Sequence, residues 1–341
     1  MSVQTTLPEE YGNLTGRKLE RAIARFEYDL ADERVQQYMV DISKELPEPT
    51  PLISIDGQCV CSRGNISVIC GEAKSKKTFL ASALVAGMLA MPIKQSKTFK
   101  NVKPNVLTNV LWLDTEQGMH HVRKVVKRIN DQIAFPDRIE PRLTTLSLRE
   151  LDPKQRKGIL YDAVRVQTYD LIVIDGIADL QRNTNDLEES DALINELMAL
   201  STKLDCHIMC ILHTNPGTDK ARGHLGSSLQ RKAESVIYVH RNGEISVVEP
   251  QFCRNEPFER FAFMVNEDGL PEVCDLPERG STESVIVGML RDSYGGRVER
   301  AVLVNKVQEQ LGIGVGAARM KVHRLTRKGV LGYDEHYVWI P

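Results

Sequence analysis

Two kinds of hydrophobic pattern alternate along the middle of the chain. Short, continuous apolar runs that are rich in β-branched residues are separated by longer stretches of helix-like polar sequence. Such runs are typical of a parallel sheet that helices cover on both faces. The runs are Ile66–Cys70, Val110–Asp114, Leu171–Asp175 and Ile208–Leu212. Closer spacing of the next runs predicts an antiparallel extension of the sheet, formed by Ser235–His240, Glu244–Glu249 and Phe261–Val265.

The two ends of the chain carry helical periodicity instead. Apolar residues recur at helical spacing between residues 17 and 44, which predicts one or two amphipathic helices. Residues 47–51 are rich in proline and predict a linker, and residues 276–282 predict a second one. The last segment predicts three helices and a hairpin, at residues 282–293, 300–311, 316–328 and 330–340. The predicted domains are an N-terminal helical segment with its linker, a large α/β domain and a small C-terminal domain, at residues 1–51, 52–275 and 276–341.

Composition narrows the class of protein. The 341 residues carry 44 Lys and Arg against 46 Asp and Glu, and this formal net charge of −2 excludes a globally basic nucleic-acid coat. Hydrophobic residues at 42% and charged residues at 26% exclude a chain that is disordered throughout. The longest apolar stretch, Phe79–Ile93, is shorter than the roughly 20 residues of a membrane-spanning helix, and the first residues do not resemble a signal peptide. Seven scattered cysteines predict reduced thiols, so we expect a cytoplasmic protein that has no membrane partner.

The first predicted strand runs into a lysine-rich loop and then into an apolar helix. This order is the setting of a phosphate-binding P-loop, and the alternative is a lysine-rich surface turn. We expect Lys77 to reach the β- and γ-phosphates of ATP, and Thr78 to place its hydroxyl on Mg²⁺. Lys76 stands where the P-loop pattern has its second glycine, the residue that permits a positive φ. The predicted nucleotide-binding residues are Gly71, Glu72, Ala73, Lys74, Ser75, Lys76, Lys77 and Thr78.

Acidic residues end two of the other predicted strands. Asp175 closes one apolar run, and at the carboxyl edge of a sheet such a residue orders Mg²⁺. A second run ends at Asp114 and is followed two residues later by Glu116. A carboxylate just past a strand end can polarise the attacking water; we assign that role to Glu116, with Asp114 as the competing candidate. The alternative for Asp175 is a cap of the next turn, and the alternative for Asp114 and Glu116 is a turn exposed to solvent.

Polar and basic residues follow the last strand of the predicted parallel sheet. We interpret His213 as a sensor of the γ-phosphate, with a strand-end histidine satisfied by backbone groups as the alternative. A basic residue from a neighbouring subunit commonly neutralises transition-state charge in oligomeric nucleotide hydrolases. Arg222 is the first candidate for this role, followed by Lys232 and Arg231, and a surface loop is the alternative.

The motifs, taken in order, resemble those of the RecA-like hexameric ATPases, in particular the RepA-type plasmid replicative helicases. They are GEAKSKKT, LWLDTE, LIVIDG, ILHTNP and ARGHLGSSL, and the resemblance covers residues 52–265. AAA+ ATPases place their catalytic glutamate beside the Walker B aspartate, where this chain has Gly176. The resemblance implies a homo-hexameric ring with ATP and Mg²⁺ at subunit interfaces and Arg222 acting on a neighbour's site. It also implies DNA contacts from loops such as the acidic residues 183–191 and residues 216–220.

The C-terminal segment, with three helices and a hairpin, resembles a winged helix. One face of the third helix is apolar, with Ala318, Val322 and Leu325. The rest of that helix carries cations and no acid, an arrangement typical of a helix that docks on DNA phosphates. The predicted DNA-binding residues are Arg319, Lys321, Arg324, Arg327 and Lys328. The alternatives are a solvated helix face and a module that docks on another protein.

We therefore expect an α/β protein with a RecA-like, parallel-sheet P-loop NTPase core, N-terminal helices and a C-terminal winged helix. The leading hypothesis is a ring ATPase that acts on DNA in a helicase-like way. The pattern also resembles ATPases encoded beside primase or mobilisation genes, which suggests replication or mobilisation of a mobile element and primase or mobilisation proteins as partners. The competing hypothesis is a nucleotide-gated, DNA-binding regulator or loader with slow hydrolysis, which Lys76 and the acidic loop motivate.

Overall fold

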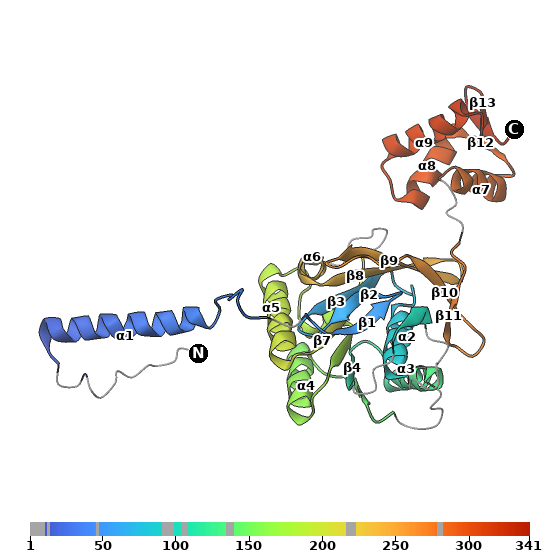
Figure 1. Ribbon diagram of the computed structural model, residues 1–341. Helices are drawn as coiled ribbons and strands as arrows, with labels where there is room; N and C mark the ends of the chain where they lie inside the picture. Colours follow the sequence, from blue (N-terminus) through green and yellow to red (C-terminus); the bar gives the residue numbers. More distant parts are fainter. Residues whose placement is uncertain are drawn as a thin grey trace. The chain divides into compact units, whose positions relative to one another are not determined.

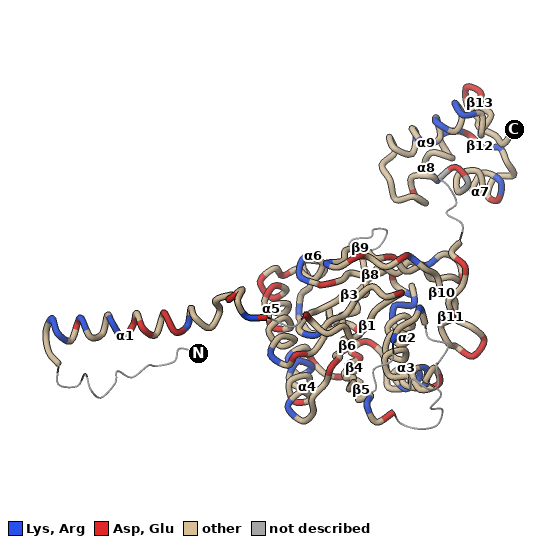
Figure 2. Tube along the Cα trace, in the orientation of Figure 1, with Lys and Arg blue, Asp and Glu red and all other residues tan. Residues whose placement is uncertain are grey.

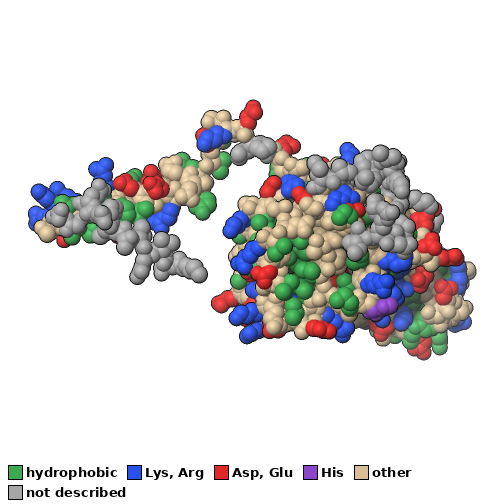
Figure 3. All heavy atoms as spheres, turned by 90° about the horizontal axis from the view of Figure 1, so that it is seen from below, with side chains coloured by type: hydrophobic (Ala, Val, Ile, Leu, Met, Phe, Trp, Pro, Cys, Tyr) green, Lys and Arg blue, Asp and Glu red, His purple; other side chains and the backbone are tan. Residues whose placement is uncertain are grey.

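The computed structural model describes residues 11, 14–45, 48–90, 99–103, 108–133, 140–215, 223–277 and 282–341. The chain forms two compact units, residues 1–48 and residues 49–341. The described part of the first unit contains one helix, α1 (Gly16–Gln36), where the sequence allowed one or two. No residue of α1 is buried, and Figure 3 shows its apolar and charged side chains next to each other.

A nine-stranded sheet forms the centre of the second unit (Figure 1), in the order β11-β10-β9-β8-β3-β7-β6-β4-β5. From β8 to β5 neighbouring strands are parallel, whereas β9, β10 and β11 add an antiparallel extension, so both predictions from the hydrophobic runs are confirmed. The strands are β3 (Ile66–Gly71), β4 (Val110–Asp114), β5 (Leu143–Ser147), β6 (Leu171–Asp175), β7 (His207–His213), β8 (Ser235–Asn242), β9 (Ile245–Cys253), β10 (Phe261–Val265) and β11 (Pro271–Cys274).

Several strands lack the apolar run that would have predicted them. Strand β5 carries two threonines and is mostly half-buried, and β11 has two exposed positions.

A separate antiparallel hairpin consists of β1 (Pro51–Ile55) and β2 (Gln58–Ser62). Because β1 begins at Pro51, the prediction of a linker is wrong at its last residue. Proline is tolerated at the first position of a strand, where its missing N–H removes no ladder hydrogen bond.

Helices cover both faces of the sheet, and each face has its own apolar core (Figure 1). Helices α2 and α3 pack on the face that contains Trp112 and Val173, whereas α4, α5 and α6 pack on the face that contains Leu113 and Ile174. Successive strand residues point to opposite faces, which is why runs such as Leu171–Ile174 of β6 do not alternate between apolar and polar residues. The helices are α2 (Lys77–Leu89), α3 (Met119–Gln132), α4 (Pro153–Val166), α5 (Leu187–Leu204) and α6 (Gly223–Lys232), with short 3-10 helices at η2 (Phe99–Asn101) and η3 (Ile177–Leu180). Within the described ranges, no helix is both long enough and apolar enough to cross a membrane.

The acidic segment 183–191, predicted to be a loop, is partly helical because α5 begins at Leu187. Its acids bind backbone N–H groups. Oδ1 of Asp186 accepts the N–H of Glu189 at 2.9 Å, and the carboxylate of Glu189 accepts the N–H groups of Arg182 and Asn183. Helix starts leave N–H groups without intrahelical partners, and the side chain of Asp186 satisfies one of them. Asp186 and Glu189 therefore have local structural roles.

The C-terminal residues form a small module of three helices and a three-stranded sheet with β14 in the middle. Its elements are α7 (Thr282–Tyr294), β12 (Arg297–Glu299), α8 (Arg300–Leu311), α9 (Val315–Arg327), β13 (Gly332–Tyr333) and β14 (Tyr337–Trp339). The helices and the hairpin agree with the sequence, whereas β12 has no apolar run and is not predicted. Ala318, Val322 and Leu325 of α9 are buried in the core of this module, as their shared face predicts.

Candidate functional site

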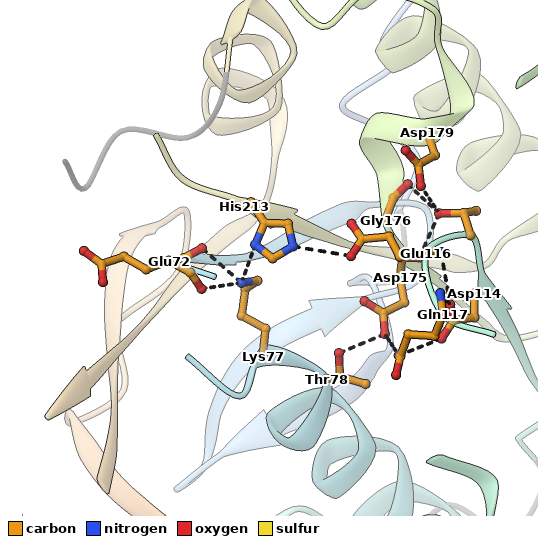
Figure 4. Close-up of polar contacts among 12 residues, drawn as sticks. Glu72, Lys77, Thr78, Asp114, Glu116, Gln117, Asp175, Gly176, Asp179 and His213 are labelled. Carbon is orange, nitrogen blue, oxygen red and sulfur yellow. Dashed lines mark hydrogen bonds and ion pairs between the residues drawn. The ribbon is translucent and has the colours of Figure 1, made fainter. Parts of the chain in front are cut away.

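Four strand ends bring the predicted polar residues together at one edge of the parallel sheet (Figure 4). His213 of β7 lies opposite Gly71 of β3, and Asp114 of β4 lies opposite Asp175 of β6. Parallel strands that pair in register end at the same edge of the sheet, and α/β proteins bind ligands there. Residues that are far apart in the sequence therefore surround the start of α2.

The loop between β3 and α2 lies close against the sheet. A Cβ atom on Gly71 would lie 2.0 Å from the carbonyl oxygen of Val239, so a side chain does not fit there. Lys74 and Lys76 both have a left-handed backbone, with φ of 64° and 69°. Lys76 thus adopts the conformation that glycine normally supplies at this position, at a cost of about 1–2 kcal/mol. Its Nζ donates to the carbonyl oxygen of Glu244 at 2.8 Å.

Lys77, the first residue of α2, is a buried cation with 5% of its surface exposed. Its Nζ donates to the carbonyl oxygens of Gly71 at 3.0 Å and Glu72 at 2.8 Å, and it lies 3.0 Å from Nδ1 of His213. Burial lowers the pKa of Lys77 to about 8, although nearby carboxylates oppose this change. A desolvated ammonium group of this kind is stabilised by an anion that replaces its lost water.

The two residues predicted to hold Mg²⁺ are in contact, since the hydroxyl of Thr78 donates to Oδ2 of Asp175 at 2.9 Å. Burial, together with the negative charge of Asp114, raises the pKa of Asp175 to about 7. Nε2 of Gln117 lies between the two carboxyl groups, 2.8 Å from Oδ2 of Asp114 and 3.5 Å from Oδ2 of Asp175. Two buried carboxyl groups of the same charge are stabilised by a divalent cation beside them.

Asp114 and Glu116, the two candidates for water activation, occupy different environments. Asp114 is fully buried, and its Oδ1 accepts the backbone N–H groups of Glu116 at 3.2 Å and Gln117 at 2.7 Å. Burial raises the pKa of Asp114. The side chain of Glu116 is 40% exposed and lines the cavity at this edge of the sheet, whereas Asp114 does not. Asp114 shapes the turn, and Glu116 reaches the open side of it.

His213 lies between Lys77 and Glu116. A lysine ammonium group has only donors, so Nδ1 of His213 accepts from Lys77 and the ring proton is assigned to Nε2. Nε2 lies 3.4 Å from Oε2 of Glu116. The imidazole therefore connects the P-loop lysine to the candidate catalytic carboxylate, a connection that strand order creates.

Gly176 gives the turn after β6 its close approach to the turn after β4. Its φ is +100°, and a Cβ atom there would lie 2.2 Å from Oγ1 of Thr115 and 2.7 Å from Cγ of Glu116. The Thr115 hydroxyl lies 3.0 Å from the carbonyl oxygen of Asp175 and 3.0 Å from Oδ2 of Asp179. Thr115, Gly176 and Asp179 hold the turn that carries Glu116, and no sequence motif predicts a role for any of them.

A cavity of about 330 Å³ lies among these groups. Lys74, Lys76, Lys77 and Arg128 line it, against two acids, Glu116 and Asp175. This excess of positive charge fits a polyphosphate. Thr78 and Asp175 supply oxygen donors, and Mg²⁺ commonly binds one or two such groups while phosphate and water complete its shell. The residues present therefore fit a nucleotide bound with Mg²⁺.

Other predicted site residues lie elsewhere. Arg222 and the loop 216–220 are outside the described residues. Arg231 and Lys232 end α6 and do not line the cavity, and Arg231 donates to Oγ of Ser228 at 3.0 Å.

The five cations predicted to bind DNA lie on and just after α9 in the C-terminal module (Figure 2). Four are exposed, Lys321 is half-buried, and Lys328 also pairs with Glu283.

Arg128 and Gln117 line the cavity without having been predicted. Gln117 directly follows Glu116, so proximity could have suggested it. Arg128 lies on α3, a helix with several basic residues, and no motif distinguishes it from the others. Only the packing of α3 against α2 brings it to the cavity.

A family model described as an AAA domain (AAA_25) matches residues 31–219, more than half of the chain. The chain therefore belongs to this family of P-loop ATPases. The matched residues include the β3–α2 loop, Glu116, Asp175 and His213. No curated protein matches the chain at a significant level.

Proposed function

We propose that this protein is a RecA-like ATPase that assembles into a ring and acts on DNA in a helicase-like way. The observation that carries the proposal is the meeting of five side chains around one positively charged cavity: Lys77, Thr78, Asp175, Glu116 and His213. Their chemical types suit the successive needs of ATP hydrolysis, which are phosphate binding, metal binding, water activation and detection of the γ-phosphate.

In the proposed reaction Lys77 binds the β- and γ-phosphates, while Thr78 and Asp175 hold Mg²⁺. The ion, when bound, neutralises charge on the phosphates. Water attacks the γ-phosphorus, the bond to the β–γ bridging oxygen breaks, and ADP and inorganic phosphate are formed. Glu116 accepts the proton of the attacking water, a role supported by its exposure beside the cavity.

His213 is proposed to sense the γ-phosphate. An incoming phosphate competes for Lys77, which without nucleotide donates to Nδ1 of His213. When Lys77 turns to the phosphate, the imidazole loses that donor and its contact with Glu116 readjusts. The change is transmitted to the segment after β7, which contains Arg222.

A homo-hexameric ring is proposed from the resemblance to RecA-like enzymes, with Arg222 completing a neighbour's site. Helix α1 supports assembly. Its apolar residues Leu19, Phe26 and Leu30 share one face, and none of the residues of α1 is buried within the chain. We propose that this face packs on the next subunit. Deletion of residues 1–45 should then lower the oligomeric state measured by light scattering, and an unchanged oligomer would contradict this role.

Contact with DNA is proposed for the C-terminal module, as a winged helix. Its support is the separation on α9 between a buried apolar face and exposed cations such as Arg319, Arg324 and Arg327. Cations on a surface helix bind phosphates, and they do so with a strong salt dependence. From the resemblance to ATPases of mobile elements, we also propose that the protein acts in the replication or mobilisation of such an element, with primase or mobilisation proteins as partners.

The test is steady-state ATP turnover by the full chain, with and without single-stranded DNA. We expect DNA to stimulate turnover. Lys77→Ala should lose both turnover and nucleotide binding. Glu116→Gln should lose turnover but still bind ATP. Turnover that persists in Glu116→Gln would remove Glu116 from water activation. Absence of nucleotide binding by the natural protein would refute the proposal as a whole.

A nucleotide-gated regulator or loader with slow hydrolysis is the second candidate. Two observations favour it: the left-handed Lys76 in the P-loop, and the place of Asp186, an acid of segment 183–191, as the N-cap of α5. Strand displacement on a forked duplex distinguishes the two candidates. Unwinding that depends on ATP would exclude the regulator, whereas binding without unwinding would favour it.

A further inference from the structure

Arg128 reaches the cavity from α3 and is held in place by two contacts. Its guanidinium carbon lies 3.5 Å from the centroid of the Phe79 ring, a stacked cation–π arrangement. Its Nε donates to the carbonyl oxygen of Gly269 at 3.4 Å. Because Phe79 directly follows Thr78, the stack holds the guanidinium group beside the Thr78–Asp175 pair.

The charge of Arg128 is poorly compensated in the nucleotide-free protein. Its Nη1 is buried and has no hydrogen-bond partner. Burial lowers the pKa of Arg128 to about 10, although the negative charge of Asp175 acts in the opposite direction. Buried arginine side chains are normally paired with an anion. The protein therefore keeps the Arg128 cation in the wall of the cavity at a net cost in folding free energy. An anion bound in the cavity would offset that cost.

We propose that Arg128 is a phosphate ligand of the bound nucleotide, supplied by the same subunit. This inference rests on the proposed function, since it requires that the cavity bind a nucleoside di- or triphosphate. Phe79 fixes the plane of the guanidinium group, and the phosphate chain lies between Arg128 on α3 and Lys77 on α2. A guanidinium group offers its donors to phosphate oxygens in one fixed plane, which an ammonium group at this position does not reproduce.

A purely structural role for Arg128 makes a different prediction. If the arginine only held α3 against α2, its loss would destabilise the protein without nucleotide and would weaken binding only as a consequence. If it is a phosphate ligand, the nucleotide-free protein keeps its melting temperature and loses affinity for phosphorylated ligands. The melting temperature without nucleotide and the affinity for phosphorylated ligands, measured on the same variant, therefore distinguish the two roles.

The test is equilibrium titration of the full chain with a fluorescent ATP analogue and with the corresponding ADP analogue, alongside thermal melting without nucleotide. Arg128→Gln should weaken both ligands at least tenfold and leave the melting temperature within about 2 °C. Arg128→Lys keeps the charge but not the plane, and should fall between the natural protein and Arg128→Gln. Arg123→Gln makes the same change at an exposed position of α3 and should bind within twofold of the natural protein.

The outcomes distinguish this inference from the proposed function. Binding by Arg128→Gln within twofold of the natural protein would overturn the inference while leaving the ATPase proposal intact. A large fall in melting temperature with no loss of affinity in Arg128→Lys would also overturn it. Phe79→Leu provides a second variant, in which Arg128 remains but its support is lost, and a several-fold loss of affinity is expected. Failure of the natural protein to bind either analogue would refute the proposed function itself.

Discussion

Replacement of Lys77 by methionine should abolish ATP binding with little change in the stability of the nucleotide-free protein at pH 7. Burial lowers the pKa of this lysine from 10.5 to about 8. Since one pKa unit corresponds to about 1.4 kcal/mol, keeping Lys77 charged in the folded state costs about 3 kcal/mol at neutral pH. Methionine loses the hydrogen bonds to the carbonyl oxygens of Gly71 and Glu72, and each bond from a charged donor contributes about 1.5 kcal/mol or more. The gain from removing the buried charge and the loss of these bonds therefore nearly cancel at pH 7.

The pH dependence gives a sharper measurement, because it isolates the charge. Below pH 8 Lys77 is protonated in both the folded and the unfolded chain, so the full cost is present. Between pH 8 and pH 10.5 the folded protein releases this proton first, and the cost decreases as the pH rises. From pH 7 to pH 9 the natural protein should thus gain about 1 kcal/mol relative to Lys77→Met.

The assay is urea unfolding at both pH values in a Trp339→Phe background. Trp112 then remains as the single tryptophan, and it is fully buried in the large sheet, so its fluorescence reports on the ATPase core. Lys124→Met, an exposed position on α3, is the control and should show no such difference. A difference between natural protein and Lys77→Met that stays constant from pH 7 to pH 9, or that changes in the opposite direction, would refute the reasoning.

Four further predictions follow from the geometry of the site and of α9. Gly176→Ala should lower kcat at least tenfold with ATP affinity kept within a few-fold, because the new Cβ displaces Glu116; steady-state kinetics and a binding titration check this. Protonation of Asp175, whose pKa is about 7, should compete with Mg²⁺, so the apparent Mg²⁺ affinity in the presence of ATP should fall about tenfold per pH unit below 7. Lys76→Gly should change ATP affinity by only a few-fold, measured by the same titration, because Lys76 already has the conformation of a glycine. Replacing Arg324 and Arg327 together by alanine should weaken DNA binding and reduce the slope of log affinity against log salt by about 2.

The sequence by itself determined those features that depend on short stretches of chain. The runs at β3, β4, β6 and β7 predicted the parallel sheet, because a strand with both faces covered is apolar at most of its positions. The P-loop position of Lys77 and Thr78 followed from the order of strand, loop and helix. The apolar face of α9 followed from helical spacing. Strands without such a pattern, such as β5 and β12, could not be found in this way.

Only the tertiary structure decided how the site is assembled. The order of the strands places His213 between Lys77 and Glu116, and this order depends on pairings between distant segments. Asp114 is buried and Glu116 is exposed, a difference between the two acids that the sequence does not reveal. Arg128 reaches the cavity through the packing of α3 on α2. Local sequence encodes which residues prefer to be buried or helical, whereas contacts between side chains depend on the register and layering of the whole sheet.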